Sequence, residues 1–223
     1  MQKFDTTAAT SAVLDIPAGR VQVIAADRAD TTVEVLPADA SKGRDVRAAA
    51  RTTVEFGDGV LRITAPAEKN QLLGASGSIE VTVQLPTGSS IEMKAAGAEF
   101  RGVGRLGDVT VEGAHGAVKI DEAASVRVTA HAGDITVGRL TGPAEISTQK
   151  GDIHIAEATS GTVVLRTRTG DVTVGSAHGV SASLDAGTGY GRIDNALKNT
   201  DGAAAGLSIH ATTDHGDITA RSL

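Results

Sequence analysis

The chain has no cysteine and no tryptophan, and its 223 residues include only three phenylalanines and one tyrosine. Without cysteine there is no disulfide scaffold, no thiolate metal site and no cysteine nucleophile, and the redox environment stays undecided. Because aromatic residues make up 2% of the chain, the core has to be built from Val, Ile, Leu and Ala. An aromatic platform for sugar rings is equally hard to assemble.

An excess of positive charge is also lacking, because 21 basic residues face 27 acidic ones and the formal net charge is −6 at pH 7. Nucleic-acid binding needs a clustered positive surface, so nucleic acid is excluded as a default partner. No apolar run approaches the ~20 residues of a membrane span, and residues 1–10 lack the apolar stretch of a secretion signal. We expect a cytoplasmic protein without a membrane span, or one at the cell surface if a signal has been removed.

Glycine, by contrast, is abundant, and eight of the 27 glycines open similar segments 17 to 25 residues apart. The strongest copies read Gly-Asp-Ile-Thr-Val or a close variant. The glycines of the series are Gly77, Gly97, Gly116, Gly133, Gly151, Gly170, Gly191 and Gly216. A second alternating segment, such as residues 144–146, lies between consecutive glycines from Gly116 onward, so each repeat there carries two short strands.

Two short strands in a repeat of 17 to 21 residues are typical of a β-solenoid, and no segment sustains the 3.6-residue period of a helix. If each repeat is one coil, equivalent strands stack ~4.8 Å apart and inward positions form columns. We therefore predict an all-β, single-chain β-solenoid like a parallel β-helix over residues 77–223. Residues 1–76 are expected to form an N-terminal β region that caps it.

The second and fourth positions after each glycine are mostly Ile and Val, which suit a packed, pleated surface. The first predicted inward column is Ile79, Glu99, Val118, Ile135, Ile153, Val172, Ile193 and Ile218. The second is Val81, Arg101, Ile120, Val137, Ile155, Val174, Asn195 and Ala220. Where Glu99 and Arg101 interrupt the columns, we predict that Phe100 points inward through a bulge, and Asn195 marks a frayed coil.

Residues 1–76 also have β character, with looser spacing. Short strands are expected at residues 21–23, 32–35, 54–56 and 61–63, the last two joined in a hairpin by a Gly-Asp-Gly turn. We expect loops over residues 37–50 and 66–76. An insertion rich in Ala, Gly and Asn is expected over residues 196–206.

The pattern resembles a large family of bacterial β-strand-repeat proteins of unknown function that are often labelled candidate adhesins. The resemblance is carried by residues 16–23 (IPAGRVQV), residues 58–63 (DGVLRI) and the Gly-Asp-Ile/Val repeats, and it covers nearly the whole chain. These motifs are structural, so the resemblance implies a fold and assigns no activity. The adhesin label implies a role at a surface.

The position directly after the glycine is aspartate in four repeats, at Asp134, Asp152, Asp171 and Asp217. Aspartates stacked at strand spacing repel one another unless something neutralises them. In the interpretation we favour, each carboxylate accepts backbone N–H bonds at its own Gly-Asp turn. In the alternative, Asp134, Asp152 and Asp171, with His154, bind a hard cation such as calcium. The favoured interpretation predicts no metal and no cofactor.

No residue pattern predicts a catalytic site, because the six histidines form no metal-binding pair and there is no phosphate loop or nucleophile elbow. We expect a non-catalytic β-repeat scaffold or an adhesin-like interaction protein, with no catalytic residue. Two alternatives stay open. One is an ion or ligand binder that uses the aspartate column, and the other is a polysaccharide-acting hydrolase or lyase of the β-helix type.

The final strand segment, residues 216–220, has no capping helix after it in the sequence. Bare ends of repeat proteins tend to pair through unpaired strand edges and exposed apolar columns. We expect the solenoid end either to be covered by residues 196–206 or to contact another protein, with self-association favoured.

Overall fold

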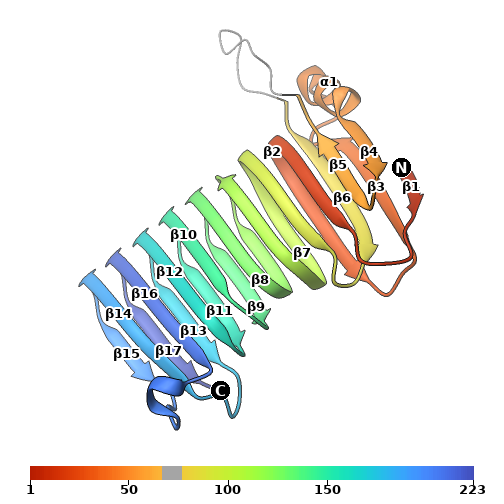
Figure 1. Ribbon diagram of the computed structural model, residues 1–223. Coiled ribbons are helices and arrows are strands. Elements are labelled where there is room, and N and C mark those ends of the chain that lie inside the picture. Colours follow the sequence, from red (N-terminus) through yellow and green to blue (C-terminus); the bar gives the residue numbers. More distant parts are fainter. Residues whose placement is uncertain (67–76) are drawn as a thin grey trace. The chain divides into compact units, whose positions relative to one another are not determined.

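The computed structural model describes residues 1–66 and 77–223, and these residues are mostly β structure (Figure 1). The contacts divide the chain into two compact units, Met1–Gly116 and Ala117–Leu223. The β class predicted from the sequence is confirmed, and most strand pairs are parallel. In the described part of the chain, no helix combines the length and the apolar character needed to cross a membrane.

The first unit is arranged around one long strand, β2. The strands of this unit are β1 (Gln2–Asp5), β2 (Ser11–Ala26), β3 (Asp30–Pro37), β4 (Thr53–Gly57), β5 (Val60–Thr64), β6 (Ile79–Pro86) and β7 (Ser90–Ala114). β2 pairs in parallel with β5, β6 and β7, and β3 runs antiparallel to β1 and β6. Strands from both sides of the boundary expected between residues 76 and 77 therefore lie in one compact unit.

Phe100 in β7 is 1% exposed, so its predicted inward position is confirmed. The predicted bulge is wrong, because the pairing with β2 runs without a shift from Gly97 to Val103. The buried position before Phe100 is Ala98, which pairs with Gly19, as Ile79 does on the other side of β2. Gly97 is therefore one position out of step with the repeat glycines, and this offset places the following glutamate outside.

The loop predicted over residues 37–50 is wrong, because α1 (Gly43–Arg51) occupies most of it. Consecutive Ala and Arg residues have high helix propensity. The carboxylate of the buried Asp45 accepts a hydrogen bond from the N–H of Ser78 at 3.0 Å, which ties the helix to the start of β6. The hairpin of β4 and β5 is confirmed, and the loop expected over residues 66–76 lies, from residue 67 on, outside the described residues.

The second unit consists of strands that pair with the equivalent strands of neighbouring repeats in space. They are β8 (Val118–Ala132), β9 (Ile135–Leu140), β10 (Ala144–Lys150), β11 (Ile153–Ala158), β12 (Gly161–Thr169), β13 (Val172–Ser176), β14 (Ala182–Tyr190), β15 (Ile193–Ala196), β16 (Leu207–His215) and β17 (Ile218–Ser222), with a 3-10 helix, η2 (Gly202–Ala204), before β16. The first stack runs β8, β10, β12, β16, β14. The second stack runs β8, β9, β11, β13, β17, β15. All of these pairs are parallel.

The two stacks depart from the order of the sequence at one end. β16 lies between β12 and β14, and β17 lies between β13 and β15 (Figure 1). Among the strands that the structure describes, β14 and β15 are therefore the outermost at this end, and the expectation that the final repeat forms the end is wrong. The final repeat has the more apolar inward residues, whereas β15 has Asn195 in an inward column. Residues 197–206 give the chain enough length to pass back from β15 to the position of β16, between β12 and β14.

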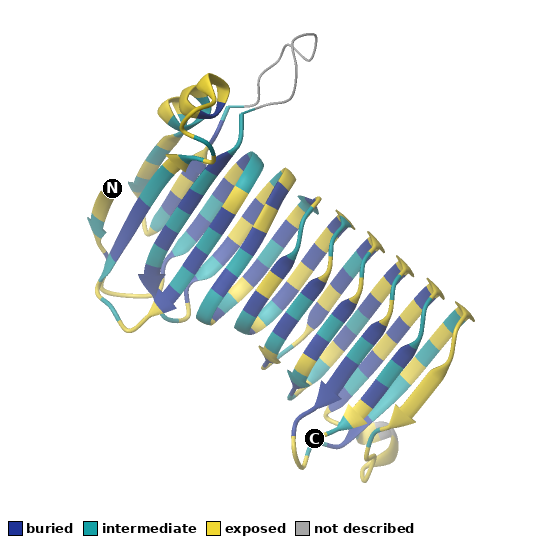
Figure 2. Cartoon of the chain, turned by 180° about the vertical axis from the view of Figure 1, so that it is seen from behind, coloured by how far each residue is buried: buried dark blue, intermediate teal, exposed yellow. Residues whose placement is uncertain are grey.

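Buried and exposed residues alternate along the strands (Figure 2). The predicted inward residues that are buried are Ile79, Val81, Val118, Ile120, Ile135, Val137, Ile153, Ile155, Val172, Val174, Ile218 and Ala220. Ile153 pairs with Ile135 on one side and with Val172 on the other, so the predicted column is confirmed there. Ile193 is 45% exposed, and its predicted burial is wrong because β15 is an edge strand.

Candidate functional site

The most regular polar feature of the second unit is the corner that leads into the second stack. Asp134, Asp152, Asp171 and Asp217 lie directly before β9, β11, β13 and β17. Each follows a glycine whose φ lies between 118° and 152°. Residues other than glycine rarely adopt this backbone conformation, so the corner depends on glycine.

Each aspartate of this column accepts a hydrogen bond from the neighbouring repeat. Oδ1 of Asp134 accepts the N–H of Asp152 at 3.0 Å, and Oδ1 of Asp152 accepts the N–H of Asp171 at 2.8 Å. Oδ1 of Asp171 accepts the N–H of Asp217 at 2.8 Å, and Oδ1 of Asp217 accepts the N–H of Arg192 at 2.8 Å. The aspartates do accept backbone N–H bonds, but the prediction that the donor lies in each residue's own turn is wrong. We call this series the aspartate ladder.

Threonines that were not predicted from the sequence reinforce the same corner. The hydroxyl of Thr167 donates to the carbonyl of Gly151 at 3.0 Å, and that of Thr213 donates to the carbonyl of Gly170 at 3.0 Å. Thr188 donates in the same way to a neighbouring repeat, at 2.9 Å. The available signal was the Thr-Xaa-Xaa-Gly spacing that precedes each of these corners.

The candidate cation ligands are brought together only in part. The hydrogen bonds place Asp134, Asp152 and Asp171 in one column. His154 lies in β11, between Thr136 and Thr173 of the adjacent strands. Within residues 1–66 and 77–223, no group of three or more His, Asp or Glu side chains is arranged to hold a metal ion.

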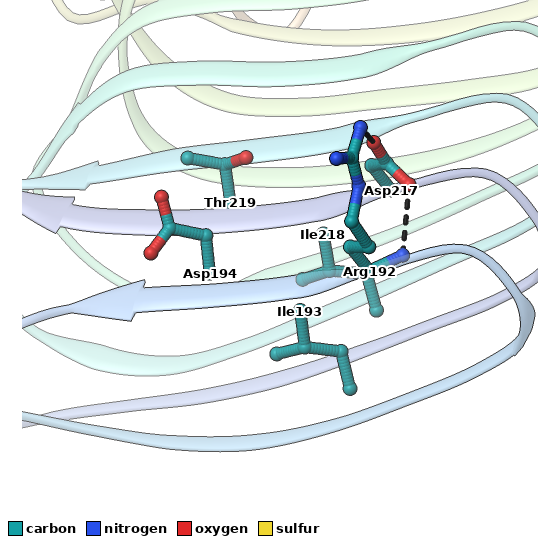
Figure 3. Close-up of a pocket in the computed structure, with 6 residues that line it drawn as sticks. All are labelled: Arg192, Ile193, Asp194, Asp217, Ile218 and Thr219. Atoms are coloured by element: carbon teal, nitrogen blue, oxygen red, sulfur yellow. Dashed lines mark hydrogen bonds and ion pairs between the residues drawn. The ribbon is translucent and has the colours of Figure 1, made fainter.

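A depression of about 500 Å³ lies at the edge of the second unit, along β15 and β17 (Figure 3). Its polar centre is the pair of Arg192 and Asp217. The N–H of Arg192 donates to Oδ1 of Asp217, and its Nη2 lies 3.5 Å from Oδ2. Asp194 lines the depression apart from this pair (Figure 3). Both carboxylate oxygens of Asp217 are thus already engaged.

A depression of about 510 Å³ in the first unit is lined by Asp15, Lys94 and Glu112 among others.

Two carboxyl groups with a lowered pKa lie outside both depressions. Hydrogen bonds from Arg28 and Lys3 lower the pKa of Asp30 to about 2. Hydrogen bonds from the hydroxyl and N–H of Ser41, with Lys42, lower the pKa of Asp39 to about 2. These pKa shifts arise from local ion pairs and a turn.

The outward face of the first stack carries paired charges from one strand to the next. Nη1 of Arg127 lies 2.8 Å from Oε2 of Glu145. Nη1 of Arg166, on the other side, lies 3.8 Å from Oε1 of the same glutamate. Further along, a ring nitrogen of His210, Nδ1, lies within hydrogen-bond distance of Oδ2 of Asp185, at 3.3 Å. We call this surface the charged face.

Comparison with known proteins gives a family match over almost the whole chain. The family model described as Toastrack DUF4097 matches residues 10–222. A candidate adhesin from Parabacteroides distasonis is 14% identical, with 98% of this chain and 95% of that chain covered and a TM-score of 0.49. A candidate cell adhesion protein from Clostridium sporogenes is 14% identical, with coverage of 100% and 99% and a TM-score of 0.40. The comparison with curated protein sequences finds no match.

Proposed function

This chain belongs to the Toastrack DUF4097 family, and from that premise we propose that it is a non-catalytic β-repeat scaffold that binds another protein in the manner of an adhesin. The proposal includes a finer architecture, in which each repeat of the second unit winds as one coil of a solenoid. Parallel, in-register pairing of strands one repeat apart supports this winding.

The charged face is the observation that carries the proposal. Arg127, Glu145 and Arg166 lie on three consecutive parallel strands of the first stack, and adjacent strands of a sheet lie ~4.8 Å apart. The charged face thus has a fixed geometry. The aspartate ladder and the buried columns hold these strands in place. A surface that is ordered before binding loses less conformational entropy when a partner docks. Repeat proteins use extended surfaces of this kind for recognition.

The use of the polar groups in the corner supports a non-catalytic role. In each ladder aspartate, one carboxylate oxygen accepts a backbone N–H of a neighbouring repeat, and in Asp217 the other oxygen pairs with the Arg192 guanidinium. A hydrolase or lyase needs carboxylates that are free to act on a substrate in a walled cleft. The regular carboxylates of this chain instead have a structural use.

Proximity labelling in cells that express the full chain tests the proposal. The charged face is altered by Arg127→Glu together with Arg166→Glu, and the control changes the same charges on α1 with Arg47→Glu and Arg51→Glu. We expect a defined set of labelled proteins that is lost with the first pair and retained with the second. Identical labelling by both variants and the parent would contradict binding through this face.

Direct assays address the enzymatic alternative. The purified chain is incubated with a panel of soluble polysaccharides, and reducing ends and unsaturated products are measured. We expect neither product above background, and turnover of any substrate would contradict the non-catalytic role.

Cell fractionation tests the separate sequence-based prediction of a cytoplasmic protein. Recovery of the protein in the surface fraction would contradict that prediction.

A further inference from the structure

The apolar column of the second stack ends at Ile193 in the edge strand β15, with no further strand stacked on it among the described residues. Ile135, Ile153, Val172 and Ile218 of this column are at most 1% exposed, whereas Ile193, which pairs with Ile218, is 45% exposed. The pairings within the described residues give β15 one neighbouring strand, β17. The other side of β15 is therefore an open edge.

The direction of the backbone groups defines what this edge offers. The carbonyl of Arg192 accepts the N–H of Ile218 at 2.8 Å, so the peptide groups of Arg192 face β17. Successive residues of a strand direct their N–H and C=O groups to opposite sides. The N–H and C=O of Ile193 consequently face the open edge. In an antiparallel pair, two directly opposed residues oriented in this way exchange both hydrogen bonds.

The charges beside Ile193 match an antiparallel copy of the same strand. If Ile193 lies opposite Ile193 of a second copy, Arg192 lies opposite Asp194 in both directions. The Arg192 guanidinium lies 3.5 Å from Asp217 and is still 90% exposed, so it stays accessible to a carboxylate of a second copy. Asp194 has no ion-pair partner within the residues that the structure describes. Opposite charges that face each other across strands are stabilising, and like charges are destabilising.

We propose that β15 is a self-association edge, which pairs antiparallel with β15 of a second copy around a two-fold axis at Ile193. A two-fold interface requires a surface that is complementary to itself, and the sequence Arg192-Ile193-Asp194 meets this requirement. Pairing buries the two Ile193 side chains against each other and provides the open peptide groups with partners.

The insertion after β15 leaves this edge open. Within it, the N–H of Lys198 donates to Ser222 Oγ at 2.9 Å, and the N–H of Thr200 donates to Ser181 Oγ at 3.1 Å. These bonds hold the insertion to the turn before β14 and to the end of β17. The exposed Ile193 shows that the segment does not cover the column.

Sedimentation velocity on the full chain, over a concentration series up to about 100 µM, tests the proposal, because weak interfaces have dissociation constants in the micromolar range. Arg192→Asp gives a strand with two negative charges, and Asp194→Arg gives one with two positive charges. We expect the parent to dimerise and each variant alone to be monomeric. An equimolar mixture of the two variants restores opposite charges at both positions and is expected to form a heterodimer.

The matched control is Thr173→Arg, which adds a charge in the same outward column but in an interior strand. It is expected to dimerise like the parent, and circular dichroism of every variant checks the fold. A parent that stays monomeric over the whole series would overturn the proposal. Dimers that persist in both single variants, or a mixture that stays monomeric, would also overturn it.

Discussion

The carboxylate of Asp171 accepts a hydrogen bond from the backbone N–H of Asp217 at 2.8 Å, although 46 residues separate them in the sequence. Asp217 in turn accepts the N–H of Arg192, which belongs to the repeat between them in the chain. The aspartate ladder thus follows the spatial order of the repeats. The same order makes β15 an edge strand and leaves Ile193 exposed.

Replacement of Asp152 by Ala removes a ladder acceptor and leaves the N–H of Asp171 without its partner. We expect the free energy of unfolding to fall by about 1 kcal/mol, the usual worth of one such bond. Asp152→Asn keeps an oxygen acceptor and is expected to cost less. Asp194→Ala, on the edge and outside the ladder, is the control. Urea denaturation measures all three, and equal costs for Asp152→Ala and the control would contradict the ladder's role.

Calcium distinguishes a structural column from a cation site. Since each Oδ1 of the ladder already accepts an amide hydrogen, we expect millimolar calcium to leave the melting temperature unchanged. The measurement is thermal unfolding with calcium and with a chelator. A rise of several degrees that Asp152→Asn abolishes would show that Asp134, Asp152 and Asp171, with or without His154, bind the ion.

Ile153→Asp places a charge inside the column between Ile135 and Val172. Burial of an unpaired carboxylate is expected to lower the free energy of unfolding by at least about 3 kcal/mol. Ile193→Asp makes the same change at the exposed end of the column and is expected to cost far less. Denaturant midpoints compare the two. A midpoint for Ile153→Asp equal to that of the parent would disprove the inward assignment.

Gly151→Ala tests the close stacking of the corners. A Cβ at this position would lie 2.3 Å from the carbonyl oxygen of Gly133, and the φ of Gly151 is 141°. We expect a loss of about 1–3 kcal/mol from clash and backbone strain. Gly187→Ala, where a Cβ meets no atom within 4 Å, is the control. Chemical denaturation of the two variants checks the difference, and similar stabilities would argue against tight corners.

The inward columns could be predicted because alternation is a local property, and Ile153 is buried between Ile135 and Val172 as its spacing indicates. The spatial position of the final repeat could not be predicted, because the last two repeats of the chain have similar sequence patterns. Their order depends on which set of inward residues tolerates an edge. The partner of Asp152 was missed for a related reason, since an Asp after Gly serves its own turn or the next repeat equally well in sequence.

The order of the repeats has a direct test, because the chain has no native cysteine. We expect a disulfide when cysteines replace Thr173 and Thr219, because these positions lie opposite each other on adjacent strands. The same holds when cysteines replace Thr219 and Asp194. Cysteines at Thr173 and Asp194 lie two strands apart, at about 10 Å, too far for a bond. Mass spectrometry after mild oxidation is expected to find the first two bonds and not the third. A bond between positions 173 and 194, without the other two, would contradict the insertion of the final repeat and the edge that it creates.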